Sequence, residues 1–173
     1  GNGTGPFGTD ARRSINCIFL NHVKAVLTSG GTDLAIYGCT FVNCPTAIHV
    51  QAYPNGYIIS NCYFSNCGTA ILGDTNGANN YANILVTSCC YQNVTTQISG
   101  IDSQVAAATD ASDEFVDSAN NDYTLNTTSN GYSSQHPQTF AEYVIANGRD
   151  IGAIQHQDPS GGGGATVHPL YAN

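Results

Sequence analysis

A ten-residue stretch of this chain occurs twice, as CTFVNCPTAI at 39–48 and as CYFSNCGTAI at 62–71. Two further stretches, INCIFLNHVKAVL at 15–27 and TSCCYQNVTTQIS at 87–99, share its pattern, and all four align without gaps. The first aligned cysteine recurs at spacings of 22, 23 and 27 residues. Repetition at such a period is typical of solenoids, because a single repeat cannot bury its apolar face and must stack on the next one.

Three columns of like residues run through the four repeats. They hold Cys17, Cys39, Cys62 and Cys89; Phe19, Phe41, Phe64 and Tyr91; and Asn21, Asn43, Asn66 and Asn93. Alternation along a strand directs every second side chain inward, so we expect cysteine to stack on cysteine and phenylalanine on phenylalanine across strands about 4.8 Å apart. Asparagine tolerates the left-handed conformation, and its amides can hydrogen-bond from coil to coil, which predicts a turn at the third column.

These columns resemble the repeat of the right-handed parallel β-helix proteins of the pectate-lyase-like superfamily. The resemblance extends over residues 15–101, and it implies an all-β fold. We therefore expect a single-stranded right-handed parallel β-helix of four to five rungs within residues 1–101. An ordinary β-sandwich is the alternative, but it does not require like residues in the same columns over four repeats. The longer last spacing falls in GDTNGANNYA at 73–82, whose composition predicts a turn.

A different pattern begins after the last repeat. DEFVDSANNDYTL at 113–125 and RDIGAIQ at 149–155 resemble a tail that follows β-helix repeats in secreted bacterial and phage-like proteins. The resemblance implies an irregular C-terminal cap over residues 102–157. Its apolar side chains are expected to cover the last rung, namely Phe115, Tyr123, Leu125 and Ile151.

The last residues, 158–173, begin with DPSGGGG, which by composition is a flexible linker. The terminal peptide ATVHPLYAN follows it and could add one strand to a neighbour. The chain opens on Gly1 and contains no Met, which favours a processed chain or a piece of a longer one. We expect three segments: rungs, cap, and linker with terminal peptide.

The charge of the chain excludes some partners. Only 9% of the residues are charged, and four basic against twelve acidic residues give a net charge of −8. Nucleic-acid binding needs clustered Lys and Arg, which are missing, and anionic membrane surfaces are disfavoured for the same reason. No apolar run approaches the ~20 residues of a transmembrane helix. We expect neither a nucleic-acid partner nor membrane insertion.

The number of cysteines, seven, is odd, so at least one is unpaired unless it pairs between chains, and they show no metal-binding C-x-x-C spacing. Cys44 and Cys67 fall in neighbouring coils at a separation that a disulfide could span. We expect the four cysteines of the first column to be reduced and to act as small apolar residues. Packing is favoured over a redox or catalytic role.

Residue types that carry catalysis are sparse in the repeats. Related β-helix enzymes cleave polysaccharides with clustered acidic residues, and glycoside hydrolysis needs two carboxylates at a set separation. Between 15 and 101 the acidic residues are Asp33 and Asp74, both in predicted turns, and the one basic residue is Lys24. We therefore predict no catalytic residues and no cofactor.

The acidic residues gather in the tail instead. They are Asp110, Asp113, Glu114, Asp117 and Asp122. A solvated capping loop is the favoured interpretation of this cluster. A Ca²⁺ site is the alternative, because carboxylate oxygens are the ligands that Ca²⁺ prefers.

Two surface features remain as candidates for glycan chemistry. Tyr53, Tyr57, Tyr63 and Tyr81 are expected in loops or at outward positions, where aromatic rings could stack on sugars. Packing between rungs is the favoured role for these tyrosines, and glycan contact is the alternative. Three N-x-T sequons predict glycosylation sites at Asn2, Asn93 and Asn126, of which Asn93 is expected to be shielded by the asparagine column.

The predicted fold has open ends, and these indicate a function. Unpaired backbone groups and apolar side chains are exposed at each end of a β-helix unless something covers them. The N-terminal GNGTGPFGTDARR shows no amphipathic capping helix. We therefore predict a non-catalytic structural or adhesive module of an extracellular, cell-surface or virion fibre assembly. Its partner would be a copy of itself or another β-helix chain. The alternatives are a fragment of a polysaccharide lyase or glycosidase, and a glycan-binding module.

Overall fold

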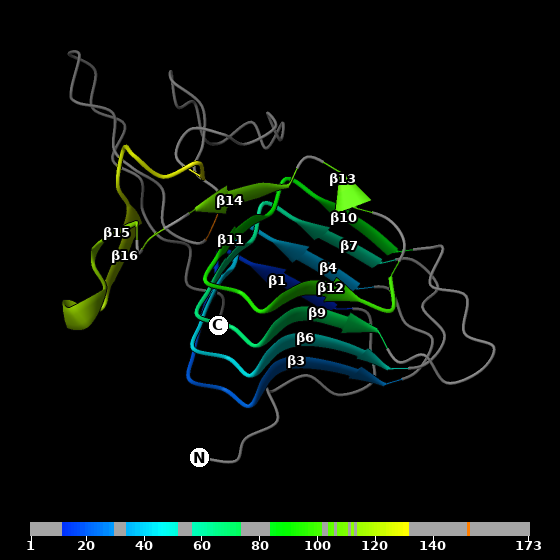
Figure 1. Cartoon of the computed structure of the whole chain (residues 1–173). Helices are drawn as coiled ribbons and strands as arrows, with labels where there is room; N and C mark the ends of the chain where they lie inside the picture. Colours follow the sequence, from blue (N-terminus) through cyan, green and yellow to red (C-terminus); the bar gives the residue numbers. More distant parts are fainter. Residues whose placement is uncertain are drawn as a thin grey trace, which may run out of the picture.

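The computed structural model is built almost entirely of β-strands, most of them parallel and arranged in three stacked sheets (Figure 1). The structure describes residues 12–29, 34–51, 57–73, 84–101, 104–105, 107–110, 112, 114–131 and 152. Within these ranges the only helix is one short 3-10 turn, and none is long and apolar enough to cross a membrane. The prediction of an all-β chain with parallel strands is confirmed.

Each sheet takes one strand from every repeat. The first sheet has the order β1 (Arg12–Ile15), β4 (Leu34–Tyr37), β7 (Tyr57–Ser60), β10 (Ile84–Thr87), β13 (Gln104–Val105). The second has the order β2 (Ile18–Leu20), β5 (Thr40–Val42), β8 (Tyr63–Ser65), β11 (Cys90–Gln92), β14 (Ala108–Asp110). The third has the order β3 (Lys24–Ser29), β6 (Thr46–Gln51), β9 (Thr69–Gly73), β12 (Thr96–Ser99). The chain thus enters the three sheets in turn, and each triplet of strands, beginning with β1, β2 and β3, pairs in parallel with the next.

Two left-handed residues in each repeat bend the chain around the short strands of the second sheet. Before the strand the positive φ angles are those of Asn16 (52°), Gly38 (57°), Asn61 (55°) and Ser88 (52°). After the strand they are those of Asn21 (59°), Asn43 (54°), Asn66 (51°) and Asn93 (48°). Asparagine and glycine adopt this conformation at low cost, which explains why the sequence repeats them at these positions. The first of these two corners is a feature that the sequence pattern did not predict.

The core is a set of stacked like residues between the three sheets. The rings of Phe19 and Phe41 lie 4.9 Å apart and nearly parallel, those of Phe41 and Phe64 lie 5.0 Å apart, and Tyr91 continues the stack at 5.3 Å. In the first sheet the inward column contains Leu34, Tyr57 and Ile84, which are register partners. The aligned columns of the sequence are therefore neighbours in space.

The cysteines are free thiols, including Cys44 and Cys67. Six of the seven are buried, and Cys17 in the first triplet is half-buried. Core thiols donate to backbone carbonyls, as Cys62 Sγ does to Ser60 O at 3.4 Å. Burial raises the pKa of the Cys62 thiol well above its ordinary value, so this sulfur stays protonated and apolar.

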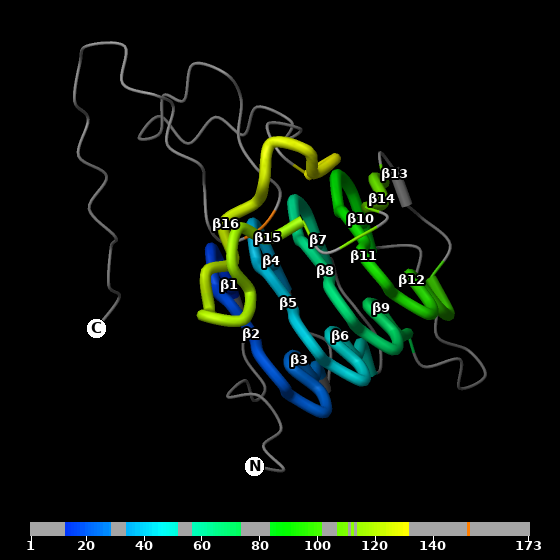
Figure 2. The backbone as a smooth tube through the Cα atoms, turned by 60° about the vertical axis from the view of Figure 1, so that its left-hand side comes forward, coloured from blue at the N-terminus to red at the C-terminus, as the bar shows by residue number. Residues whose placement is uncertain are grey.

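An antiparallel hairpin covers the side of the stack rather than its end (Figure 2). It consists of β15 (Phe115–Asp117), the 3-10 turn η2 (Ser118–Asn120) and β16 (Asp122–Leu125), and is called the flank hairpin below. A second apolar cluster joins it to the outer face of the second sheet and comprises Val42, Tyr63, Cys90, Phe115, Tyr123 and Leu125. The expectation that Phe115, Tyr123 and Leu125 cover the last rung is therefore wrong. They lie on the flank because the outward positions of the second sheet are themselves apolar.

Gly152, in the RDIGAIQ motif, also lies against the side of the stack. Its N–H donates to Asn61 O at 2.9 Å, and its φ of 115° is one that residues with a side chain rarely adopt. A Cβ atom at this position would lie 2.7 Å from Thr40 Oγ1. The motif glycine is thus fixed at the corner between the first and second sheets, whereas Ile151 and residues 158–173 lie outside the described residues.

Candidate functional site

The buried carboxylate of Asp110 joins the second sheet to the segment that follows the flank hairpin. Asp110 Oδ2 accepts hydrogen bonds from Tyr63 Oη at 2.6 Å and from Ser129 Oγ at 2.6 Å. Its Oδ1 accepts from the backbone N–H of Asn130 at 2.6 Å, and Cys90 Sγ lies 3.6 Å from Oδ2. Asp110 is only 3% exposed, so the expectation of a solvated loop is wrong at this residue. Its four partners satisfy the carboxylate, as a buried charge requires.

The neighbours of Asp110 are held in their neutral forms. Burial first, and then the hydrogen bond to Asp110, raise the pKa of Tyr63 well above its ordinary value of 10.0. Burial and the charge of Asp110 raise the pKa of the Cys90 thiol above its ordinary value of 9.0. Neither side chain is therefore prepared to act as a nucleophile or base. The chemistry of this cluster is the anchoring of a segment by charge-assisted hydrogen bonds.

These raised pKa values predict a loss of stability in alkali. Above a pH of about 9 the unfolded chain loses protons that folded Cys90 and Tyr63 retain, so the free energy of unfolding decreases as pH rises. We expect the melting temperature to be level from pH 6 to 8 and to decrease from about pH 9 upward, measured by circular dichroism. Tyr63→Phe should reduce the slope above about pH 10. A melting temperature unchanged from pH 8 to 11 would contradict this assignment.

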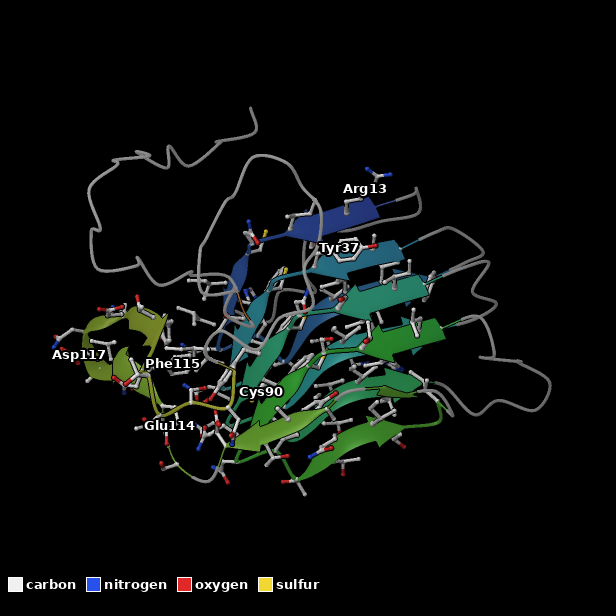
Figure 3. All side chains as sticks on the ribbon, turned by 90° about the horizontal axis from the view of Figure 1, so that it is seen from above. Arg13, Tyr37, Cys90, Glu114, Phe115 and Asp117 are labelled. Atoms are coloured by element: carbon white, nitrogen blue, oxygen red, sulfur yellow. The ribbon has the colours of Figure 1, made fainter. Side chains whose placement is uncertain are left out.

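A cleft of about 150 Å³ lies between the flank hairpin and the second sheet. Its floor includes Val42 and Ser65, from the neighbouring strands β5 and β8. The opposite wall includes Phe115 and Tyr123, whose rings meet edge to face at 5.2 Å, and two residues of η2 also line the cleft. Figure 3 shows Phe115 between the hairpin and the sheets, with Asp117 at the far side of the hairpin. The cleft therefore has an aromatic wall and, at the corner after the second sheet, the polar side chains of Asn43 and Asn66.

The asparagine column borders this cleft, and it is hydrogen-bonded in two separate pairs. Asn43 Nδ2 donates to Asn21 Oδ1 at 3.2 Å, and Asn93 Nδ2 donates to Asn66 Oδ1 at 2.7 Å. Among the described residues no side-chain hydrogen bond joins Asn43 to Asn66, although the residues before them, Val42 and Ser65, are register partners. Both amides line the cleft, so the ladder is interrupted where the cleft opens.

The tyrosines predicted as glycan contacts are placed differently from expectation. Tyr57 is 1% exposed because it occupies the inward column of the first sheet with Leu34 and Ile84. Tyr63 points outward, but Phe115 packs on its ring at 5.1 Å and it has no exposed surface. The prediction that these two residues contact glycans is therefore wrong. Tyr53 and Tyr81 lie outside the described residues.

Two of the three predicted glycosylation sites can be located. Asn93 is exposed, contrary to the expectation that it would be shielded, although its Nδ2 is engaged with Asn66. Asn126 is half-buried, and its Nδ2 donates to Phe115 O at 2.9 Å. Each glycan-accepting nitrogen therefore already serves as a hydrogen-bond donor within the fold. Asn2 lies outside the described residues.

The other acidic side chains that the structure describes in the tail have local partners. Glu114 accepts from Ser112 Oγ and Thr128 Oγ1, and Asp117 accepts from the side chain of Asn120. Asp122 accepts from the N–H of Thr124, and hydrogen bonding by Thr124 lowers the pKa of this carboxyl. Within the described ranges no three His, Cys, Asp or Glu side chains are grouped to hold a metal ion, and Asp113 is not described.

Comparisons of the chain with family models, with curated proteins and with solved structures find no match. No relative therefore assigns a role to the cleft or to the Asp110 cluster. Sequence reasoning identified the asparagine column but neither the role of Asp110 nor the cleft, since both depend on where the flank hairpin packs.

Proposed function

We propose that this chain forms a single-stranded right-handed parallel β-helix of four to five rungs and serves as a non-catalytic structural or adhesive module. We place it in an extracellular, cell-surface or virion fibre assembly. The sheet orders and the in-register stack from Phe19 to Tyr91 support the helical course. The low content of charged residues and the core of stacked apolar columns suit a rigid rod rather than a chemical catalyst.

The terminal edge formed by β1, β2 and β3 supports this proposal. β1, β2 and β3 are each the terminal strand of their sheet among the described residues, so their outer backbone groups face the same end of the stack. Three apolar side chains of this triplet or its corners are exposed, Ile15 by 45%, Ile18 by 37% and Val23 by 52%, whereas its inward residues Ala25 and Val26 are fully buried. An edge with these properties is a template for another strand. We infer that a further coil of the same kind, from a copy of this chain or from another β-helix chain, stacks on it.

A pair of matched valine substitutions tests this association. Val23 and Val116 have nearly equal exposure, 52% and 53%, but Val23 belongs to the first triplet and Val116 to the flank hairpin. We expect Val23→Lys to raise the dissociation constant of the assembly at least about tenfold, because a lysine at a sheet edge disfavours pairing with a further strand. Sedimentation velocity over a range of concentrations measures this constant.

In the same experiment Val116→Lys should leave association unchanged, because the hairpin lies on the flank. Equal behaviour of the two variants, or a wild-type chain that stays monomeric at high concentration, would contradict stacking through the first triplet. Thermal melts of both variants would show that the substitutions left the fold intact.

A further inference from the structure

The interruption of the asparagine ladder leaves two complementary polar groups at the cleft. In the described part of the chain Asn43 Oδ1 receives no hydrogen bond, and Asn66 Nδ2 donates none. Both side chains are exposed, and both line the cleft. A hydroxyl group donates and accepts at once, so one hydroxyl, or two neighbouring hydroxyls on a ring, could join Asn66 to Asn43. We propose that this cleft binds one sugar residue of a neutral saccharide.

The aromatic wall supplies the second element of such a site. Phe115 and Tyr123 are held by the apolar cluster beneath the hairpin, and their rings are edge to face at 89°. Binding sites for small ligands combine apolar and aromatic surface with a few polar groups that fix orientation. Phe115 is 6% and Tyr123 8% exposed, so the wall offers a small apolar area to the C–H groups of one sugar ring, while the asparagine amides bind its hydroxyls.

The charge and size of the cleft restrict the ligand. None of the described residues that line the cleft carries a charge, so a uronic acid or a sulfated sugar gains no counter-ion from them. A volume of about 150 Å³ is below the roughly 300–1,000 Å³ of sites for drug-sized molecules, which limits occupancy to about one ring. A peptide strand is disfavoured because β5 and β8 are already paired on both sides. A neutral sugar residue is the ligand class that fits all three restrictions.

Two glycine variants distinguish the role of the Asn66 amide in the cleft from its role in the asparagine column. Asn66→Gly and Asn93→Gly both delete the same hydrogen bond, the one from Asn93 Nδ2 to Asn66 Oδ1. Both positions have positive φ, 51° and 48°, so glycine preserves the backbone in each case. The variants differ in that Asn66→Gly removes an amide that lines the cleft, whereas Asn93 is not among its lining residues.

The probes are neutral homo-oligosaccharides of hexose, pentose and N-acetylhexosamine units, titrated into the ¹⁵N-labelled full chain and followed by NMR. We expect at least one probe to shift the amide signals of Asn43, Asn66 and η2 at millimolar or lower concentration. Asn66→Gly should weaken its binding about tenfold, the effect of one lost hydrogen bond with its orphaned partner. Asn93→Gly should change it less than about twofold, because it leaves the lining of the cleft intact.

Three results would overturn the proposal: no neutral probe shifting these signals, equal weakening by the two variants, or tighter binding of an oligouronide or an unrelated peptide to the cleft. The site does not depend on association through the first triplet. Val23→Lys should retain full saccharide binding, so failure of stacking and failure of the cleft can be told apart.

Discussion

Phe41→Ala is expected to lower the free energy of unfolding by about 3–5 kcal/mol. Phe41 has no exposed surface and lies between Phe19 and Phe64, with ring centroids 4.9 Å and 5.0 Å away. Its removal opens a cavity that cannot collapse, because strand pairing fixes the spacing of the coils above and below. Urea denaturation followed by circular dichroism measures the loss.

The matched control is Phe19→Ala, at the end of the same column. Phe19 stacks on one member of the column and is 7% exposed, so its loss should cost clearly less than the loss of Phe41. Phe41→Leu, which retains most of the volume, should cost less than about half as much as Phe41→Ala. Equal costs for Phe19→Ala and Phe41→Ala would show that the rings do not form a continuous stack.

Asp110→Asn is expected to cost about 3 kcal/mol, because it replaces a charged acceptor of three short hydrogen bonds by an amide with one oxygen. If the NH₂ group faces Asn130, two N–H groups oppose each other, and if it faces Tyr63 and Ser129, their hydroxyls lose their acceptor. The loss should be local. Hydrogen exchange should accelerate over residues 114–131, while the amides of the three sheets keep most of their protection.

The control for this substitution is Asp117→Asn, at an exposed carboxylate that caps η2. Asparagine is as good an N-cap as aspartate, so stability should change by less than about 0.5 kcal/mol. A double-mutant cycle of Asp110→Asn with Tyr63→Phe should give a coupling of about 0.5–3 kcal/mol. A coupling of zero would mean that the 2.6 Å hydrogen bond from Tyr63 Oη to Asp110 Oδ2 contributes nothing to docking of the tail.

The all-β parallel architecture could be predicted because the repeats constrain it directly. Register between parallel strands places residue i beside its counterpart one repeat later, and the aligned phenylalanines are indeed register partners. The left-handed corner at Asn43 could be foreseen for the same reason. The corner before the strand was missed because its column mixes residue types, as at Gly38 and Ser88.

The packing of the flank hairpin could not be predicted, because the repeats do not indicate which segment packs on their outer face. Tyr63 is outward by alternation, and only the position of Phe115 shows that it is covered. Asp110 resembles a solvated acid in the sequence, and only the fold brings Ser129 and Tyr63 to it. Tyr57 was misplaced for a local reason: it lies outside the aligned segments, so the alignment of the repeats does not reveal its inward column.

The chain tolerates unequal numbers of residues between the third strand of one triplet and the first strand of the next. These stretches are residues 30–33, 52–56 and 74–83, yet Leu34 and Ile84 both pair with Tyr57 in unbroken register. Loop-closure entropy rises only slowly with length, so extra residues here cost little. This edge of the molecule is therefore the natural place to graft foreign epitopes or enzyme tags at regular intervals along a scaffold.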